Sequence, residues 1–192
     1  MKPLILASQS PRRKQLLKQV HVPFSIEASL VEEEMNNEEA PGDLVISLAK
    51  QKAEEVYSRF SHAIVLGADT IVVVDDHVLG KPKDEYDAKE MLQRLSGRAH
   101  QVYTGVYIVS KEKHVSFFEV SDVKFYSLEE DEIDAYVRSG EPADKAGAYG
   151  IQGIGATLVE SIKGDYFSIV GLPIAKVVRA LKEFEIEGYP QT

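Results

Sequence analysis

The sequence predicts an α/β protein in which a mixed β-sheet is flanked by helices. Short β-branched runs alternate with amphipathic, helix-length segments in the first half of the chain, which is typical of strands joined by helices. Two longer strand-like runs, 101–109 and 114–126, follow one another across a polar turn and predict a hairpin. The 192 residues are 44% apolar, enough for one domain or for two small lobes that share the sheet.

The first elements form a strand, a turn and a helix. Residues 4–7 are an apolar run of strand length, followed by the turn Ser8-Gln9-Ser10. Ser10 is expected as the N-cap of a helix in which Pro11 occupies a favoured first position. A second strand is expected at 24–28, and it leads into the acidic run Glu32 to Glu34.

The middle of the chain continues this alternation. Pro41-Gly42-Asp43 opens a long helix whose core-facing residues reach Phe60. Two β-branched runs, 63–66 and 71–74, follow, and we expect Gly67-Ala68-Asp69-Thr70 to interrupt them. Asp84 is expected to cap a third helix, which ends at Ser96-Gly97.

The last part adds two helices and a strand. The capping-box pattern Ser127-Leu128-Glu129-Glu130 predicts a helix to Val137. A strand is expected at 157–162, and Pro173 begins a final helix. Because the sequence contains neither a repeat nor a linker, we predict one domain over residues 1–192.

Composition restricts the function. With 31 acidic and 22 basic residues the net charge is −9, which disfavours binding of long nucleic acid but leaves room for a single nucleotide. There is no cysteine to form a disulfide or a thiolate metal site. The N-terminal apolar run, 3–7, is too short for a signal peptide, and no stretch approaches the ~20 residues of a membrane span. We therefore expect a soluble cytoplasmic protein without a membrane partner.

An anion site is the strongest chemical signal in the residues themselves. Ser8, Ser10, Arg12 and Arg13 surround the start of the first helix, where free backbone N–H groups and the helix dipole attract anions. The arginine fork suits phosphate oxygens. The alternative is an ordinary Ser-Pro helix start with solvated arginines.

Other candidates are weaker when taken alone. Asp69 follows a buried strand and two small residues, so it is suited to bind Mg²⁺ or to take a proton from water, or it is an ordinary turn aspartate. Lys81 lies between Gly80 and Pro82 and is a candidate phosphate contact, although the segment is not a Walker A loop. The glycine-rich run 147–155 either lets a ligand approach the backbone or is a flexible loop. The five histidines lack metal-ligand spacing.

Five blocks occur in order along the chain: 4–13, 67–72, 79–82, 96–105 (through Ser96-Gly97, His100 and Thr104-Gly105) and 164–173. Taken together, these blocks resemble the Maf family of nucleotide pyrophosphatases, named for an association with septum formation. The family's usual Val-Asp-Glu reads Val31-Glu32-Glu33 here, which keeps the final glutamate.

The resemblance implies a fold similar to inosine-triphosphate pyrophosphatase, with two lobes around a cleft and often a homodimer. It implies hydrolysis of dTTP and UTP to the monophosphate and pyrophosphate, with Mg²⁺ or Mn²⁺ as cofactor. It also implies a role for each of nine residues. These are Asp69 as proton acceptor and metal ligand, Glu33 as metal ligand, Ser8, Arg13, Lys52 and Lys81 as triphosphate ligands, and Arg12, Thr70 and Gln152 as determinants of the dTTP/UTP branch.

The implied chemistry is consistent with these residue types. The Gln152 amide can donate to O4 of uracil or thymine and accept from N3–H, whereas cytosine reverses both groups. The alternative function is a non-catalytic nucleotide-binding regulator of septation. A regulator has no need for a water-activating carboxylate, so pyrophosphate release from a nucleotide panel distinguishes the two.

Overall fold

The computed structural model describes residues 2–36 and 38–187 and confirms the predicted α/β class with a mixed sheet. Within the described residues the sheet has seven strands in the order β2-β1-β3-β5-β6-β7, and β4 pairs with β3. The strands are β1 (Leu4–Leu6), β2 (Ser25–Ile26), β3 (Ile64–Val74), β4 (His77–Leu79), β5 (Ala99–Val109), β6 (His114–Phe125) and β7 (Val159–Lys163). The helices are α1 (Pro11–Gln19), α2 (Pro41–Arg59), α3 (Glu85–Leu95), α4 (Glu130–Arg138), α5 (Tyr166–Val170) and α6 (Ile174–Lys182), with short 3₁₀ turns η1 (Glu141–Asp144), η2 (Ala146–Ala148) and η3 (Gly153–Leu158).

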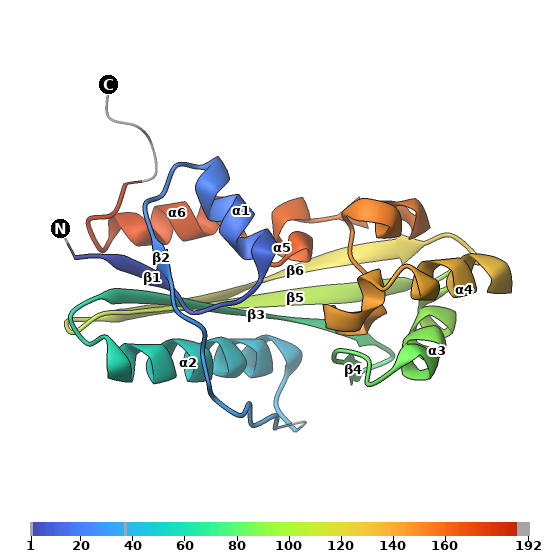
Figure 1. Cartoon of the computed structure of the whole chain (residues 1–192), viewed down its shortest axis with the longest axis horizontal. Coiled ribbons are helices and arrows are strands. Elements are labelled where there is room, and N and C mark those ends of the chain that lie inside the picture. Colours follow the sequence, from blue (N-terminus) through green and yellow to red (C-terminus); the bar gives the residue numbers. More distant parts are fainter. Residues whose placement is uncertain (1, 37, 188–192) are drawn as a thin grey trace. The chain divides into compact units, whose positions relative to one another are not determined.

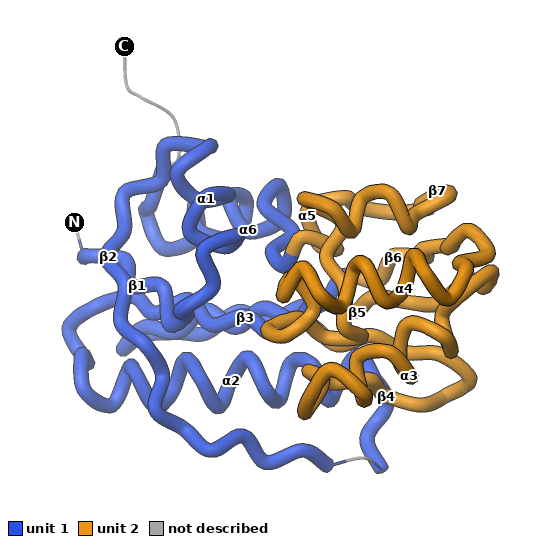
Figure 2. The backbone as a smooth tube through the Cα atoms, turned by 45° about the vertical axis from the view of Figure 1, so that its right-hand side comes forward, with its two compact units in different colours: residues 1–69, 104–119, 171–192 blue, residues 70–103, 120–170 orange. Residues whose placement is uncertain are grey.

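The chain divides into two compact units, each assembled from separate stretches of sequence (Figure 2). Unit 1 comprises residues 1–69, 104–119 and 171–192, and unit 2 comprises residues 70–103 and 120–170. Strands β3, β5 and β6 each contribute residues to both units.

Unit 1 has helices on both faces of its strands. Strand β1 pairs in parallel with β2 and with β3, and Leu6 lies opposite Leu66 in the second pairing. Helix α2 runs along one face, and α1 and α6 lie on the other (Figure 1). The core between α2 and the strands consists mainly of small and β-branched residues: Ile5, Ala7, Ala49, Ala53, Val56, Ala63, Val65, Tyr107 and Val109.

Two glycines allow α2 to approach the sheet closely. A Cβ atom on Gly67 of β3 would lie 2.4 Å from the carbonyl oxygen of Ala49, and one on Gly105 of β5 would lie 2.4 Å from that of Val45. Neither distance is tolerated between real atoms, so only glycine permits this backbone-to-backbone packing. The packing fixes α2, and with it Lys52, relative to the end of β3 in this unit.

The structure differs from the sequence-based expectations most clearly in three places. Gly67-Ala68-Asp69-Thr70 does not interrupt two runs, because β3 continues through it and uses its small residues to pack against α2. Strand β4 was not predicted; the turn before it uses Asp75 and Asp76 with positive φ, a turn that aspartate tolerates. Helix α4 has Glu129, not Ser127, as its N-cap, and the Glu129 backbone N–H donates to the Glu132 carboxylate at 2.8 Å.

Unit 2 combines two antiparallel pairings with a long irregular segment. Strand β4 pairs with the end of β3, and β7 pairs with the end of β6. Asp84 caps α3 as predicted, its side chain accepting a hydrogen bond from the Asp87 N–H. The glycine-rich run forms the 3₁₀ turns η2 and η3 and the loop that connects them.

Candidate active site

The N-terminus of α1 holds the serine and arginine residues of the predicted anion site. Ser10 caps the helix as predicted, and its hydroxyl accepts from the Arg13 N–H. Arg13 is only 8% exposed: its Nε donates to the Gly171 carbonyl at 2.7 Å and its Nη1 to the Ser8 hydroxyl at 3.3 Å. These bonds fix the guanidinium next to the helix start.

The surroundings of Arg13 are both buried and charged. Burial lowers the pKa of the Arg13 guanidinium, while the Asp69 and Glu33 carboxylates oppose that shift. The positive charge of Arg12, on the first turn of the same helix, also lowers the pKa of Arg13. A bound phosphate would stabilise both cations, because an anion so close to them offsets burial and mutual repulsion.

Lys52 joins the two candidate metal-site carboxylates. The Lys52 ammonium, on α2, lies 3.1 Å from Glu33 Oε1 and also donates a hydrogen bond to Asp69 Oδ1 on β3. The Lys52 and Asp69 side chains are 15% and 14% exposed, and Glu33 is 38% exposed. Residues from three separate segments of unit 1 therefore meet at one point, beside a buried arginine.

The donor set at this point suits a small hard cation. Glu33 and Asp69 supply two carboxylates bound to the same ammonium. No group of three or more metal-ligating side chains was found in the described part of the chain. Mg²⁺ typically takes one or two protein carboxylates and completes its shell with water and substrate phosphates, so this pair fits it.

The remaining predicted residues lie on unit 2. Thr70 directly follows Asp69 in β3. Lys81 is exposed in the turn after β4, and Gln152 is exposed immediately before η3. The Gly147 N–H donates to the Gly80 carbonyl at 3.0 Å, which ties the glycine-rich segment to the turn that carries Lys81.

Two contacts of residues in the family-like segments were not predicted from the sequence. The Gly171 carbonyl holds Arg13, and no side-chain pattern announces a backbone acceptor 158 residues away. In unit 2 the buried His100 bonds through Nε2 to the Tyr149 hydroxyl at 2.7 Å, and the two rings pack edge to face. His100 therefore packs in the core of unit 2.

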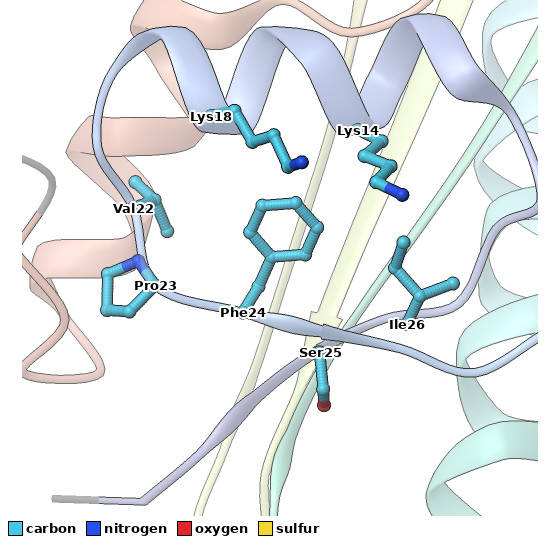
Figure 3. Close-up of a pocket in the computed structure, with 7 residues that line it drawn as sticks. All are labelled: Lys14, Lys18, Val22, Pro23, Phe24, Ser25 and Ile26. Carbon is cyan, nitrogen blue, oxygen red and sulfur yellow. The ribbon is translucent and has the colours of Figure 1, made fainter.

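A pocket of about 340 Å³ lies elsewhere on unit 1, between α1 and β2 (Figure 3). Lys14 and Lys18 extend from α1 toward Phe24 and Ile26, and the lining contains none of the nine predicted site residues. The pocket is therefore separate from the Lys52 cluster.

Comparison with known proteins identifies the protein family. The sequence model of the family described as Maf-like protein matches residues 3–184, and the chain belongs to that family. A dTTP/UTP pyrophosphatase of Bacillus cereus (strain G9842) is 58% identical over 187 residues, covering 97% of this chain and 98% of that protein. The dTTP/UTP pyrophosphatase of Bacillus mycoides (strain KBAB4) is 57% identical over 185 residues, covering 96% and 97%. That of Bacillus cytotoxicus is also 57% identical over 185 residues, with the same coverage.

The helices were also compared with the requirements of a membrane span. Among the described residues no helix combines the length and the apolar character that crossing a bilayer requires.

Proposed function

We propose that this protein is a nucleoside triphosphate pyrophosphatase that hydrolyses dTTP and UTP to the monophosphate and pyrophosphate. The names of its Bacillus relatives support the substrates. The observation that carries the reaction is the Lys52 ammonium bound to both Glu33 and Asp69 beside Arg13. Such a cluster contains both a carboxylate able to accept a proton from water and cations able to bind phosphate.

In this proposal Asp69 accepts the proton of the attacking water. Its carboxylate is engaged by Lys52 before substrate binds. Triphosphate oxygens compete for that ammonium, so substrate binding moves Lys52 onto phosphate and leaves Asp69 able to take a proton. Ser8 and Arg13 hold phosphate oxygens at the start of α1, and Lys81 supplies a further cation.

Glu33 and Asp69 are the residues that would hold Mg²⁺ or Mn²⁺. When bound, the ion neutralises charge on the triphosphate and on the departing pyrophosphate. Cytoplasmic location and a homodimer belong to the same proposal. Light scattering of the purified protein tests the homodimer.

We assign selection of the nucleotide base to Gln152. Arg12 and Thr70 are the other two residues that match the dTTP/UTP branch. Gln152 is exposed and therefore accessible to a ligand. Its amide can donate to O4 and accept from N3–H of uracil or thymine. A site built on such bonds discriminates strongly, because the wrong base leaves polar groups unpaired.

The test is pyrophosphate release from dTTP, UTP, CTP, ATP and 7-methyl-GTP with Mg²⁺ present. We expect kcat/KM for dTTP and UTP to exceed that for the other three nucleotides. Gln152→Glu should reduce this preference, because an ionised carboxylate cannot donate to O4. A purine triphosphate ranked first would contradict the base assignment, and binding without turnover would favour the non-catalytic regulator of septation.

A further inference from the structure

The segment that carries Gln152 is a loop closed at its base. A Cβ atom on Gly155 would lie 2.1 Å from the Gly150 carbonyl oxygen and 2.7 Å from the Tyr136 hydroxyl. The two ends of the segment 150–155 therefore touch each other, and Gln152 lies exposed between them. Glycine restricts the backbone less than any other residue. A loop with glycines at 150, 153 and 155 therefore needs hydrogen bonds from outside the loop to hold one conformation.

Tyr136 and Glu141 provide these anchors on both sides of Gln152. The Tyr136 hydroxyl accepts from the Gly150 N–H at 3.1 Å. The two oxygens of Glu141 accept from the N–H groups of Ile154, at 2.9 Å, and Gly155, at 3.2 Å. The backbone is thus held two residues before Gln152 and again two and three residues after it.

The two anchors are themselves connected. The Tyr136 side chain is 2% exposed in α4, and its hydroxyl is hydrogen-bonded to the Glu141 carboxylate. The bond from the Ile154 N–H, followed by that from Gly155, lowers the pKa of the Glu141 carboxyl, so it remains ionised near neutral pH. An ionised carboxylate can accept several hydrogen bonds at once, which this arrangement requires.

We propose that Tyr136 and Glu141 are positioning residues that set the placement of the Gln152 amide and thereby the base selectivity of the enzyme. This inference rests on the proposed function, in which Gln152 contacts the base. Neither residue touches substrate in this role. Base discrimination depends on amide placement to a fraction of an ångström, so loosening the loop should affect selectivity before it affects the chemical step.

The first experiment replaces Tyr136 with phenylalanine, which removes both hydrogen bonds and keeps the buried ring. We expect the ratio of kcat/KM for dTTP to that for CTP to fall by about 10-fold, the effect of a displaced polar contact, while kcat for dTTP changes little. Tyr107→Phe is the matched control, because the Tyr107 hydroxyl donates to Glu54 at 3.2 Å in unit 1 and is also buried. The control should retain the wild-type ratio.

The second experiment asks whether Tyr136 acts through Gln152. In a Gln152→Ala background, Tyr136→Phe should leave the already lowered ratio unchanged, since the residue it positions is gone. An equal fall in both backgrounds, or a wild-type ratio in a folded Tyr136→Phe protein, would overturn the proposal. If Tyr136→Phe does not fold, Glu141→Gln decides, because the NH2 group that replaces one carboxylate oxygen cannot accept the backbone bond made there.

Gln152→Ala alone separates this inference from the proposed function. A wild-type ratio in that variant contradicts base contact by Gln152, and with it both proposals. A lowered ratio in Gln152→Ala combined with a wild-type ratio in Tyr136→Phe and Glu141→Gln contradicts only the positioning role.

Discussion

At the scale of single residues, opposite charges meet at Lys52 in the candidate active site. Lys52 and Arg13 supply two positive charges, and Glu33 and Asp69 supply two negative ones. Arg13 and Lys52 are largely buried, so neither of these cations is easily left without a partner. In the proposed function, a triphosphate and a metal ion would bring opposite charges and could together replace the internal pairing without leaving a group unpaired.

Asp69 is the residue on which turnover should depend most. Asp69→Asn keeps an oxygen that accepts from Lys52 but loses the basic carboxylate, so we expect turnover to fall at least ~10²-fold with the fold intact. Pyrophosphate release measures the first effect and a thermal melt the second. Near-normal turnover in a well-folded variant would remove Asp69 from the role of proton acceptor.

Glu33 is tested through the metal. We expect chelation to abolish activity, and Glu33→Gln to raise the Mg²⁺ concentration needed for half-maximal activity or to abolish activity. Mn²⁺ binding without nucleotide, followed by electron paramagnetic resonance, should weaken in parallel. Glu34→Gln is the control, because the Glu34 side chain is next to Glu33 in the sequence but is exposed and takes no part in the Lys52 cluster. Full activity in chelator would contradict the metal assignment.

His100 links stability to pH. Burial lowers the pKa of the His100 imidazole from 6.5 to about 4, and its neighbours are the Tyr149 hydroxyl and the Phe125 ring. The folded state therefore prefers the neutral ring, whereas the unfolded chain takes up a proton below about pH 6.5. This contribution is complete above pH 6.5 and is lost progressively as the pH falls from 6.5 to about 4, by about 3 kcal/mol in total.

Urea unfolding at pH 7 and pH 4.5 measures this effect. His100→Gln should lose less unfolding free energy between the two pH values than the wild type does. His62→Gln, which changes an exposed histidine, should follow the wild type. Equal losses in all three proteins would show that His100 does not titrate as expected.

At the scale of elements, the packing of α2 on the strands of unit 1 depends on the absence of side chains. Gly67→Ala should lower the free energy of unfolding by about 1–3 kcal/mol, because the added methyl group meets the Ala49 carbonyl. Gly80→Ala is the control, since a Cβ there has no neighbour within 4 Å. Denaturant titration compares the two, and equal stability of both variants would contradict the close-packing account.

The same feature explains why some elements were predicted well and others were not. Helices such as α2 and α3 follow from periodicity and from caps such as Asp84, which are local signals. The prediction of a strand break at Gly67 was wrong. A glycine that permits close tertiary packing cannot be distinguished, from the neighbouring sequence alone, from a glycine that ends a strand. The N-cap of α4 is Glu129, whose backbone N–H donates to the Glu132 carboxylate. The sequence also matches a capping-box pattern that begins two residues earlier, at Ser127, so the pattern alone did not place the cap correctly.

At the scale of the whole molecule, the roles of the site residues came from family resemblance and their spatial arrangement from the structure. The serines and arginines at α1 are close in sequence, so an anion site could be predicted there from local residues alone. Glu33, Lys52 and Asp69 lie on different segments, and their meeting at one ammonium depends on how α2 packs. The contacts of Tyr136 and Glu141 with the Gln152 loop could not be predicted from the sequence, because both side chains accept hydrogen bonds from backbone N–H groups, which are the same in almost every residue.

The bond between Arg13 and Gly171 has a consequence for biosynthesis. Arg13 lies in α1, and its carbonyl partner lies 158 residues later in the chain. A growing chain on the ribosome therefore carries the start of α1 long before the segment that fixes Arg13 has been translated. Contacts this distant in sequence form late and slow folding. Arg13 thus acquires its final orientation among the last events of folding. If Arg13 binds phosphate as proposed, nascent chains that end before Gly171 should not yet bind nucleotide as the finished protein does.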